Sequence, residues 1–433
     1  MLIEFTLKNY TSFFEETTFS MQANNSEVLK KFNTFSSNGF GRLLKSAFVF
    51  GANGSGKSNF VKSALYMRSI IVSDLILQGR LLEDNNFFLF NTESINMPRG
   101  FEMIFVAKDD KMYKYGFEFQ KGEIVSENLE YKSKGKKPVV LFSRKSSNFE
   151  DITLSEQMKD VEIFKKNTRP DTLFLYWGNA GNNKFARNVF EWFGNLQIFD
   201  ATNSNSLVNI TYDYIKKNEH AKSKVLEFIQ KADFDIVDFD FKEIEDEQNI
   251  KLLKKIARKN IFENTAVTKK LEFTTQRALY NESKEKIAVV ECQSHMESLG
   301  TLKLFSLAGA VLSTLENGNV IFLDEIDSNL HPNLVRYVVE LFNSISQNAN
   351  NAQLICNTHN ALLLEEAIRI DQIYFVEKDE RGASSMYSLD EFKGATKNNQ
   401  LMEQYLIGLY GATPKTRRFL PLKEPVLQPS LLD

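Results

Sequence analysis

The chain is poor in cysteine, proline and tryptophan for its 433 residues. Its two cysteines, Cys292 and Cys356, cannot build a disulfide framework or, on their own, a zinc site. It has no run of about 18 apolar residues, the length that a membrane-spanning helix needs. The N-terminal MLIEFTLKNY lacks the charged and apolar regions of a signal peptide. We therefore expect a cytoplasmic protein that does not cross a membrane.

Neither sign of charge dominates, because 53 lysines and arginines face 56 aspartates and glutamates, for a net charge of −3. A protein that coats nucleic acid would be more basic overall, although this balance is compatible with local basic patches. The hydrophobic share of 42% and the charged share of 25% are globular values, which excludes disordered and collagen-like chains. The lack of sustained heptads excludes a long coiled-coil arm.

Hydrophobic patterning predicts an α/β protein. Alternation and short apolar runs predict strands, and an apolar period of three to four residues predicts helices. The expected strands are residues 2–8, 17–21, 46–50, 236–241, 320–323, 353–356 and 373–377, with an antiparallel meander over 101–131. The expected helices are residues 58–78, 185–193, 214–231, 299–315 and 334–347.

A glycine-rich segment links the expected strand 46–50 to the helix after it. Gly51-Ala-Asn-Gly-Ser-Gly-Lys57-Ser58 matches the phosphate-binding pattern G-x-x-x-x-G-K-[ST]. In such a P-loop, backbone N–H groups converge on the β-phosphate, the lysine reaches the phosphates and the hydroxyl ligates Mg²⁺. The nucleotide-binding residues predicted here are Gly51, Ala52, Asn53, Gly54, Ser55, Gly56, Lys57, Ser58 and Asn59.

Two carboxylates end the expected strand 320–323. Val320-Ile-Phe-Leu-Asp324-Glu325 has the form of a Walker B strand. Asp324 is placed to support Mg²⁺, with Ser58 as the other protein ligand. Glu325 is placed to orient and deprotonate an attacking water. Taken alone, this pattern is also compatible with an ordinary strand end.

The residues after Glu325 are more specific. Ile326-Asp327-Ser-Asn-Leu-His-Pro332 resembles the D-loop of ATP-binding-cassette (ABC) ATPases, which places Asp327 in the nucleotide site. The strand 353–356 leads into His359, and in the ABC class the equivalent histidine contacts the γ-phosphate and holds the catalytic water. A histidine at a strand end can also be a simple polar cap. One strand–helix unit separates His359 from Asp324, as the functional role requires.

A short motif opens the expected helix 299–315. In Glu297-Ser-Leu-Gly-Thr301, Ser298 would cap the helix whatever its other role. The ABC signature motif occupies this place and offers a serine and a glycine, here Ser298 and Gly300, to the γ-phosphate of the other subunit's nucleotide. The order of the motifs favours an ABC-type ATPase head over a ring-forming AAA+ motor or a kinase.

The sequence resembles a known family. It is similar to the AAA-domain ABC ATPases related to RecF and the SMC heads, in the branch with RloA-like and abortive-infection ATPases and the ATPase half of OLD-family proteins. Besides the motifs above, Leu2–Phe13 and Tyr405–Ala412 contribute to the resemblance. It covers residues 1–130 and 285–415 well, and the middle of the chain only loosely.

The resemblance implies an α/β fold: an ABC-type head with a P-loop mixed sheet flanked by helices, an antiparallel β-subdomain and an inserted α/β or helical lobe. The expected domains are the two halves of the head, residues 1–135 and 286–415, the inserted lobe, 136–285, and a tail, 416–433. The resemblance also implies binding of ATP and Mg²⁺, slow hydrolysis, and ATP-dependent association of two or more chains.

The biological role that the resemblance implies is that of an anti-phage sensor controlling a separate effector. The chain ends soon after Ala412, so we expect it to lack the Toprim nuclease domain of OLD proteins and the effector to supply such a nuclease. An alternative is a RecF- or SMC-like DNA-maintenance ATPase that binds DNA directly. A third possibility is a scaffold that binds nucleotide without turnover.

The sequence departs from the family pattern in two further places. Thr11 stands where many relatives have a basic residue that contacts the nucleotide, and the Q-loop glutamine has no clear position near Phe87–Asn91. Two basic segments, Lys132–Lys137 and Lys251–Lys259, are either solvated surface or nucleic-acid contacts. We expect an aromatic segment around Trp177 and Trp192 to form the core of the inserted lobe, and no metal besides Mg²⁺.

Overall fold

The computed structural model describes residues 1–201, 204–217, 220–232, 235–244, 270–393, 395 and 400–414. Its strands are β1 (Leu2–Lys8), β2 (Thr17–Ser20), β3 (Thr34–Ser36), β4 (Arg42–Leu44), β5 (Ser46–Phe50), β6 (Arg99–Val106), β7 (Met112–Gln120), β8 (Glu123–Lys132), β9 (Val139–Arg144), β10 (Ile152–Leu154), β11 (Gln197–Asp200), β12 (Ile236–Ile244), β13 (Lys270–Tyr280), β14 (Lys286–Gln293), β15 (Val320–Asp324), β16 (Gln353–Asn357), β17 (Ile373–Lys378) and β18 (Ser384–Ser388). Its α-helices are α1 (Lys30–Asn33), α2 (Lys57–Val72), α3 (Leu75–Glu83), α4 (Phe174–Ala180), α5 (Lys184–Asn195), α6 (Ser204–Lys216), α7 (Ala221–Ala232), α9 (Leu299–Asn317), α10 (Pro332–Asn343) and α11 (Leu401–Leu406). Short 3₁₀ helices are η1 (Ser94–Asn96), η2 (Phe149–Asp151), η3 (Glu156–Asn167), η4 (Ser294–Met296), η5 (Ala361–Glu365), η6 (Ile370–Gln372) and η7 (Leu389–Glu391).

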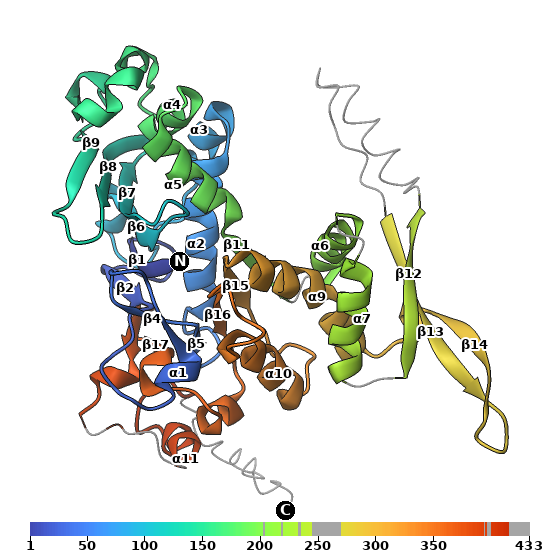
Figure 1. The fold of residues 1–433 in the computed structure, drawn as a ribbon. Helices are drawn as coiled ribbons and strands as arrows, with labels where there is room; N and C mark the ends of the chain where they lie inside the picture. The colour runs from blue at the N-terminus through green and yellow to red at the C-terminus, as the bar shows by residue number, and fades with distance from the viewer. Residues whose placement is uncertain are drawn as a thin grey trace, which may run out of the picture.

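A six-stranded, mainly parallel sheet forms the centre of the molecule (Figure 1). Its order is β11-β15-β16-β5-β17-β18, and only β18 runs antiparallel to its neighbour. Strands β5, β15 and β16 are buried along their whole length, which explains their continuous apolar sequences. Strand β5, from the N-terminal part of the chain, lies between β16 and β17 from the C-terminal part. The carboxyl ends of parallel strands meet at one edge, and the P-loop starts there.

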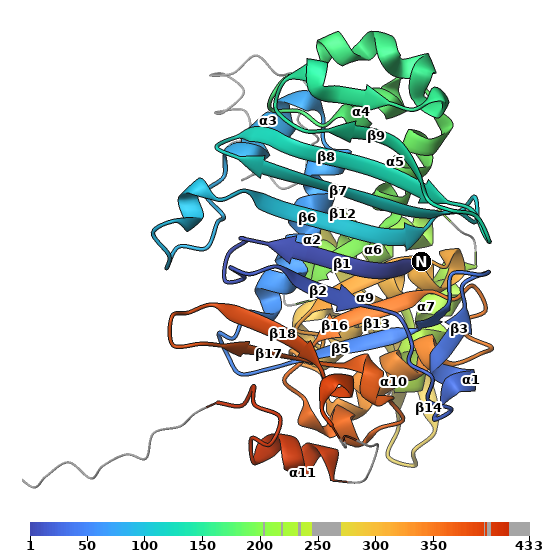
Figure 2. The same cartoon turned by 90° about the vertical axis from the view of Figure 1, so that its left-hand side faces the viewer.

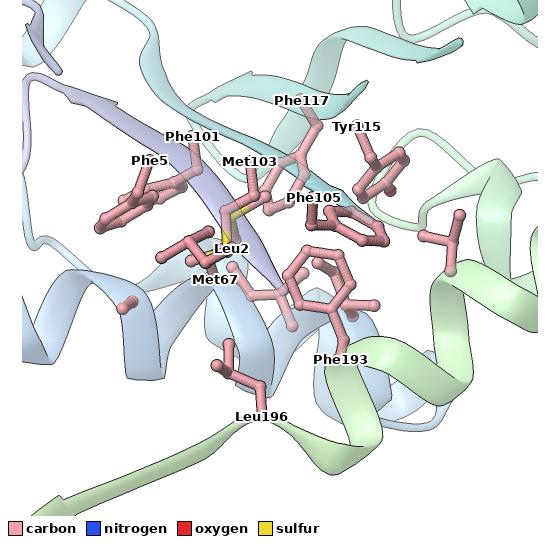
Figure 3. Packing of buried hydrophobic residues seen from close by; sticks show 14 of the residues in the cluster. Leu2, Phe5, Met67, Phe101, Met103, Phe105, Tyr115, Phe117, Phe193 and Leu196 are labelled. Carbon is pink, nitrogen blue, oxygen red and sulfur yellow. The ribbon is translucent and has the colours of Figure 1, made fainter. Parts of the chain in front are cut away.

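A seven-stranded antiparallel sheet packs beside it, in the order β10-β9-β8-β7-β6-β1-β2 (Figure 2). Its strands alternate between buried and partly exposed residues, as the sequence of β7 predicted. Figure 3 shows the inward-facing residues packed between this sheet and the helices α2 and α5. The labelled residues are Leu2, Phe5, Met67, Phe101, Met103, Phe105, Tyr115, Phe117, Phe193 and Leu196. The predicted fold class, a P-loop mixed sheet with an antiparallel β-subdomain, is confirmed by this topology.

The expected inserted lobe, residues 136–285, contributes to several parts of the structure. Strands β9 and β10 extend the antiparallel sheet, and β11 joins the parallel sheet beside β15. The helices α6 and α7 and the three-stranded sheet β12-β13-β14 project to one side, as Figure 1 shows. The domain boundaries at 135 and 285 therefore stay a prediction. The expected tail and the basic segment Lys251–Lys259 lie outside the described residues.

Two of the predicted helices are wrong, because each is divided into two helices in the structure. The helix expected at 58–78 ends at Val72, and Asp74 then caps α3 by accepting hydrogen bonds from two backbone N–H groups. The helix expected at 214–231 is two helices, α6 and α7. Trp177 and Trp192 pack against a core as expected, but it is the core of the antiparallel sheet. The expectation that they form a core of the inserted lobe is wrong, because residues of that lobe share one cluster with β1, β6 and β7.

Helix α9 has the length and hydropathy of a membrane span, but two thirds of it is buried inside the protein. It packs against the parallel sheet and α6, so it is a core helix of this fold.

Candidate functional site

A pocket of about 640 Å³ opens at the carboxyl edge of the parallel sheet. The sequence-predicted residues that line it come from segments far apart in the chain, the P-loop, the end of β15 and the end of β16. They are Asn53, Gly54, Gly56, Lys57, Ser58, Asn59, Glu325 and His359. Lys378, at the end of β17, also lines the pocket. The structure thus brings the predicted P-loop, Walker B glutamate and switch histidine together in one site.

The P-loop conformation depends on glycine. Gly51 and Gly56 have φ angles of 157° and 118°. A Cβ atom on Gly51 would lie 2.4 Å from the Val376 carbonyl oxygen. A Cβ atom on Gly56 would lie 2.3 Å from Ser384 Oγ. The loop can therefore follow this path only with glycine at both positions.

Polar side chains from three segments, the buried Ser12 and Ser384 and the partly buried Asn59, hold the P-loop in place. Ser384 Oγ donates to the Ser55 carbonyl oxygen at 2.5 Å, and the Ser384 N–H donates to the Ser12 carbonyl oxygen at 2.7 Å. Asn59 Nδ2 donates to Ser12 Oγ at 2.8 Å. These bonds connect the P-loop to the β1–β2 turn and to strand β18. They fix the position of the loop relative to both sheets.

Lys57 is the first residue of α2 and is only 5% exposed. Its Nζ donates to the carbonyl oxygens of Gly51 and Ala52, at 2.8 and 3.0 Å. Burial lowers the pKa of Lys57 to about 8, while nearby carboxylates, Asp327 first among them, favour its charged form. The ammonium is therefore mostly protonated at pH 7 and lies in a partly dehydrated site, where its field acts strongly on an anion.

The end of β15 is held by the neighbouring strand. Asn357, fully buried at the end of β16, donates from Nδ2 to the Asp324 carboxylate and accepts through Oδ1 from the Glu325 N–H. Glu325 has a left-handed backbone, with φ of 53°, which costs a non-glycine residue on the order of 1 kcal/mol. The amide of Asn357 stabilises this conformation. As a result, the Glu325 side chain faces the pocket while Asp324 stays almost buried.

Asp327 and His359 are linked directly. The Asp327 carboxylate accepts a hydrogen bond from the His359 backbone N–H, at 3.1 Å for the shorter contact. Partial burial and then the Lys57 ammonium lower the pKa of His359, which favours the neutral imidazole at pH 7. A neutral imidazole can donate one hydrogen bond and accept another.

The signature residues lie beside this site and do not line its pocket. Ser298 caps α9 by accepting from the Thr301 N–H at 3.1 Å, as expected. Gly300 lies next to the Asn329 carbonyl oxygen of the D-loop, where a Cβ atom would be at 3.2 Å. Leu299, between them, is 67% exposed. The start of α9 therefore faces outward, next to the D-loop.

Glu297 fixes the start of α9 from the other side. Its carboxylate accepts from Arg277 Nη2 at 2.6 Å and from the Thr275 hydroxyl, both on β13. Burial alone would raise the pKa of Glu297, but these hydrogen bonds hold it below its ordinary value. The ion pair joins the signature segment to the projecting three-stranded sheet.

The polar groups at the pocket suit a nucleotide and Mg²⁺. Ser55 Oγ is buried and has no hydrogen-bond partner among the described residues, so the P-loop contains an unpaired polar atom. The candidate metal ligands, the Ser58 hydroxyl and the Asp324 carboxylate, are oxygen donors, which Mg²⁺ prefers. In the described part of the chain, no group of three or more His, Cys, Asp or Glu side chains could hold a metal ion.

Sequence reasoning missed two residues of this site. The sequence patterns give Asn357 no role of its own, although a polar residue at the end of a buried strand is a signal of one. Lys378 was missed because its role depends on β17 lying beside β5, which the pattern of β17 alone does not reveal. Thr11, the departure from the family pattern, lies in a left-handed turn and donates from its backbone N–H to the Asn86 carbonyl oxygen at 2.7 Å.

Comparisons with solved structures give remote similarities to SMC heads and to RecF. The SMC head domain from Thermotoga maritima is 13% identical, with 89% of this chain and 98% of that chain covered and a TM-score of 0.40. An SMC head bound to the C-winged helix domain of ScpA is 15% identical, with 89% and 97% covered and a TM-score of 0.43. The recombination mediator RecF with ATP is 14% identical, with the same coverage and a TM-score of 0.34. No curated protein matches the chain in sequence.

Residues 46–365 match the family described as "AAA domain, putative AbiEii toxin, Type IV TA system". The matched region runs from the first residue of β5 through the P-loop, the signature segment, β15 and β16 to the end of η5. Since it spans most of the chain, the protein belongs to this family of AAA-domain P-loop ATPases.

Proposed function

We propose that the protein binds MgATP and hydrolyses it slowly at composite sites formed by two copies of the chain. Lys57 and the P-loop amides would hold the phosphates, and Glu325 would act as the general base. His359 would sense the γ-phosphate, and Asp327 would position His359 through its backbone. Ser298 and Gly300 of the other copy would complete the site.

The observation that supports this proposal best is the convergence of Lys57, Glu325 and His359 on one pocket. The outward-facing start of α9 supports the second part, since Ser298 and Gly300 do not line the pocket of their own chain. Mg²⁺, held by Ser58 and Asp324, would neutralise charge on the phosphate oxygens. Binding would close the two copies on each other and hydrolysis would release them, so the ATP state would act as a switch.

We extend the proposal to a biological role in the cytoplasm. The family description names a toxin of a type IV toxin–antitoxin system, which supports a defence role of the abortive-infection kind. In this role the ATP-dependent assembly would control a separately encoded effector, such as a Toprim-type nuclease. This part rests on family membership and on no particular side chain.

The test is the solution mass of the Glu325→Gln variant with and without MgATP. Removal of the base should trap the closed state, so MgATP should double the mass, and the added change Lys57→Ala should abolish the effect. A variant that stays monomeric with MgATP bound would contradict the composite site. A large assembly already present without ATP would show that another interface forms the oligomer.

The alternative, direct DNA binding, is tested in the same samples. The turn at 132–137 contains lysines that are exposed in the structure, and it is where such contact would be sought. Salt-sensitive DNA binding that appears only with MgATP and is weakened by Lys134→Glu would favour the alternative. Binding of a co-expressed partner protein without DNA would favour the effector-control role.

A further inference from the structure

Lys303 is a buried lysine to which the proposed function gives no role. It lies on α9, five residues after Ser298, and its side chain is 1% exposed. Its Nζ donates a hydrogen bond to the Ala201 carbonyl oxygen. The residues that follow it, Leu304 and Phe305, belong to the apolar core. Burying an ammonium among such residues costs free energy, so the lysine at this position needs an explanation.

The bond from Lys303 leads to the end of the Walker B strand. Ala201 follows β11, the neighbour of β15 in the parallel sheet, and Asp200 is in register with Asp324. The Ala201 N–H donates to the Asp324 carbonyl oxygen at 2.9 Å. Two consecutive hydrogen bonds therefore connect α9 to the backbone that precedes Glu325.

The charges around Lys303 are those of the catalytic edge, by which we mean the carboxyl edge of the parallel sheet with Asp324, Glu325 and Asp327. Burial lowers the pKa of Lys303 to about 8, while the carboxylates of Asp200, Asp327 and Glu325 favour its charged form. Asp327 and Glu325 act in the same way on Lys57. Two buried ammonium groups, one on α2 and one on α9, therefore lie in the field of the same two carboxylates.

Helix α9 is firmly attached to its surroundings on the side away from the P-loop. Gly309 lies so close to α6 that a Cβ atom would be 2.4 Å from Thr211 Cα, and its N–H donates to Thr211 Oγ1 at 3.0 Å. Figure 1 shows α9 beside α6 and α7, with β12–β14 beyond them. Lys303 lies five residues after Ser298, which is only about 7.5 Å along a helix. Because this distance is short, a displacement of the start of α9 would also move Lys303.

We propose that Lys303 is a positioning residue that couples the signature end of α9 to the catalytic edge of the same chain. When Ser298 and Gly300 contact the partner's nucleotide, the Lys303 ammonium holds the end of β15, and with it the Glu325 carboxylate, in the arrangement that hydrolysis needs. Each copy would thereby hydrolyse its own ATP only after its signature helix has engaged the other copy. This inference rests on the proposed composite site.

The chain offers a matched control in Lys45. Like Lys303 it is buried, at 3% exposure, and its Nζ contacts a single carbonyl oxygen, that of Ser344, at 3.5 Å. Burial lowers its pKa as well. It precedes β5, at the edge of the parallel sheet opposite the P-loop. Lys45→Met therefore removes a buried ammonium from the same sheet without touching the site.

The experiment compares wild type, Lys303→Met, Lys303→Arg, Lys45→Met and Lys57→Ala in the full chain. Steady-state ATPase kinetics give kcat and KM, equilibrium titration gives MgATP affinity, and thermal unfolding gives Tm. We expect Lys303→Met to lower kcat about ten- to a hundredfold, the size of a misplacement effect. Its KM and MgATP affinity should stay within about twofold of wild type. Lys303→Arg should recover part of kcat, and Lys45→Met should lower Tm alone.

Full activity of Lys303→Met would overturn the inference, and so would an equal loss of kcat in Lys45→Met, which would reveal a general stability effect. Loss of MgATP affinity in proportion to kcat would also overturn it, because the residue would then act in nucleotide binding. The Lys57→Ala variant separates these outcomes from failure of the proposed function. If it hydrolyses ATP as fast as wild type, the proposed function and this inference both fall.

Discussion

At the scale of single residues, the site depends on buried polar groups whose charge or hydrogen bonding is set by their surroundings. Lys57 is an example, because burial brings its pKa to about 8, close to physiological pH. Its ammonium favours a bound phosphate, and a neutral amine at the same place would not. The affinity for MgATP should therefore depend on pH in a range where an exposed lysine would stay fully charged.

The expected dependence follows from the fraction of Lys57 that is protonated. Between pH 7.5 and pH 9 this fraction falls, so the apparent affinity should fall by roughly eightfold if only the charged form binds. Titration of MgATP at several pH values measures it. The Lys57→Ala variant should bind more weakly and without this slope. An equal slope in wild type and variant would assign the pH dependence to another group.

Asn357 should matter for both stability and turnover. Its substitution by alanine removes a donor from the Asp324 carboxylate and an acceptor from the Glu325 N–H. Buried groups left unpaired in this way cost about 1–3 kcal/mol each. The free energy of unfolding should fall accordingly, and ATP turnover should fall further than stability explains, because Glu325 loses its fixed backbone.

The control for this change is Asn348→Ala. Asn348 is as buried as Asn357 and makes hydrogen bonds of the same kind, to the Phe342 and Ala352 carbonyl oxygens and the Ala352 N–H, away from the pocket. Denaturant unfolding should show a comparable loss for both variants. ATPase assays below the unfolding range should show a loss only for Asn357→Ala. Equal turnover in the two variants would disprove the role given to Asn357.

At the scale of helices and strands, α6 and α9 make a close contact through a glycine. Gly309 on α9 has no room for a side chain, because a Cβ atom would lie 2.4 Å from Thr211 Cα. Gly309→Ala must push the two helices apart and break the hydrogen bond between the Gly309 N–H and Thr211 Oγ1. We expect the free energy of unfolding to fall by about 1–3 kcal/mol, as for overpacking in a core.

Gly194 in α5 provides the opposite case. Nothing lies within 4 Å of the place where its Cβ would be. Gly194→Ala should therefore raise the free energy of unfolding by up to about 1 kcal/mol, the difference in helix propensity. Unfolding in denaturant compares the two variants directly. Equal changes in the free energy of unfolding for Gly309→Ala and Gly194→Ala would mean that the contact between α6 and α9 can accommodate the added methyl group.

Lys57, Glu325 and His359 could be assigned to one site from sequence because their motifs follow buried parallel strands, whose carboxyl ends share an edge. The end of α2 at Val72 also has a signal in the sequence, because Asp74 is a favourable N-cap residue for a new helix. The apolar residues continue at helical spacing beyond Val72, however, and so predict one longer helix. The four residues of β11 form a strand because they pair with β15, so their own sequence does not predict it.

The role of Asn357 could not be predicted for a similar reason. It requires β16 to lie beside β15 with Leu323 opposite Cys356, and register between distant strands is a tertiary property. The left-handed backbone of Glu325 likewise depends on that neighbour. Local patterns thus located the chemistry of the site, and long-range pairing supplied the contacts that hold it in place.

At the scale of the whole molecule, both large cores share the parallel sheet. On β5, Ala47 and Val49 belong to the core that includes the antiparallel sheet. The alternate residues Phe48 and Phe50 belong to the core that includes α9 and α10. Since β5 lies between strands from the C-terminal part of the chain, neither core can form completely before that part is in place. We therefore expect the described folded part to unfold in a single cooperative transition.

The two tryptophans allow a test, because Trp177 and Trp192 both pack against the first core, whereas MgATP would bind at the edge of the shared sheet. Tryptophan fluorescence and far-UV circular dichroism should give the same unfolding midpoint. A hundredfold excess of MgATP over its Kd should stabilise the fold by about 2.7 kcal/mol and shift both midpoints equally. Lys57→Ala should lose the shift. Two separate transitions would instead mean that the antiparallel sheet folds on its own. A fluorescence midpoint that MgATP does not shift would mean that the stabilisation by bound nucleotide does not reach this sheet through β5.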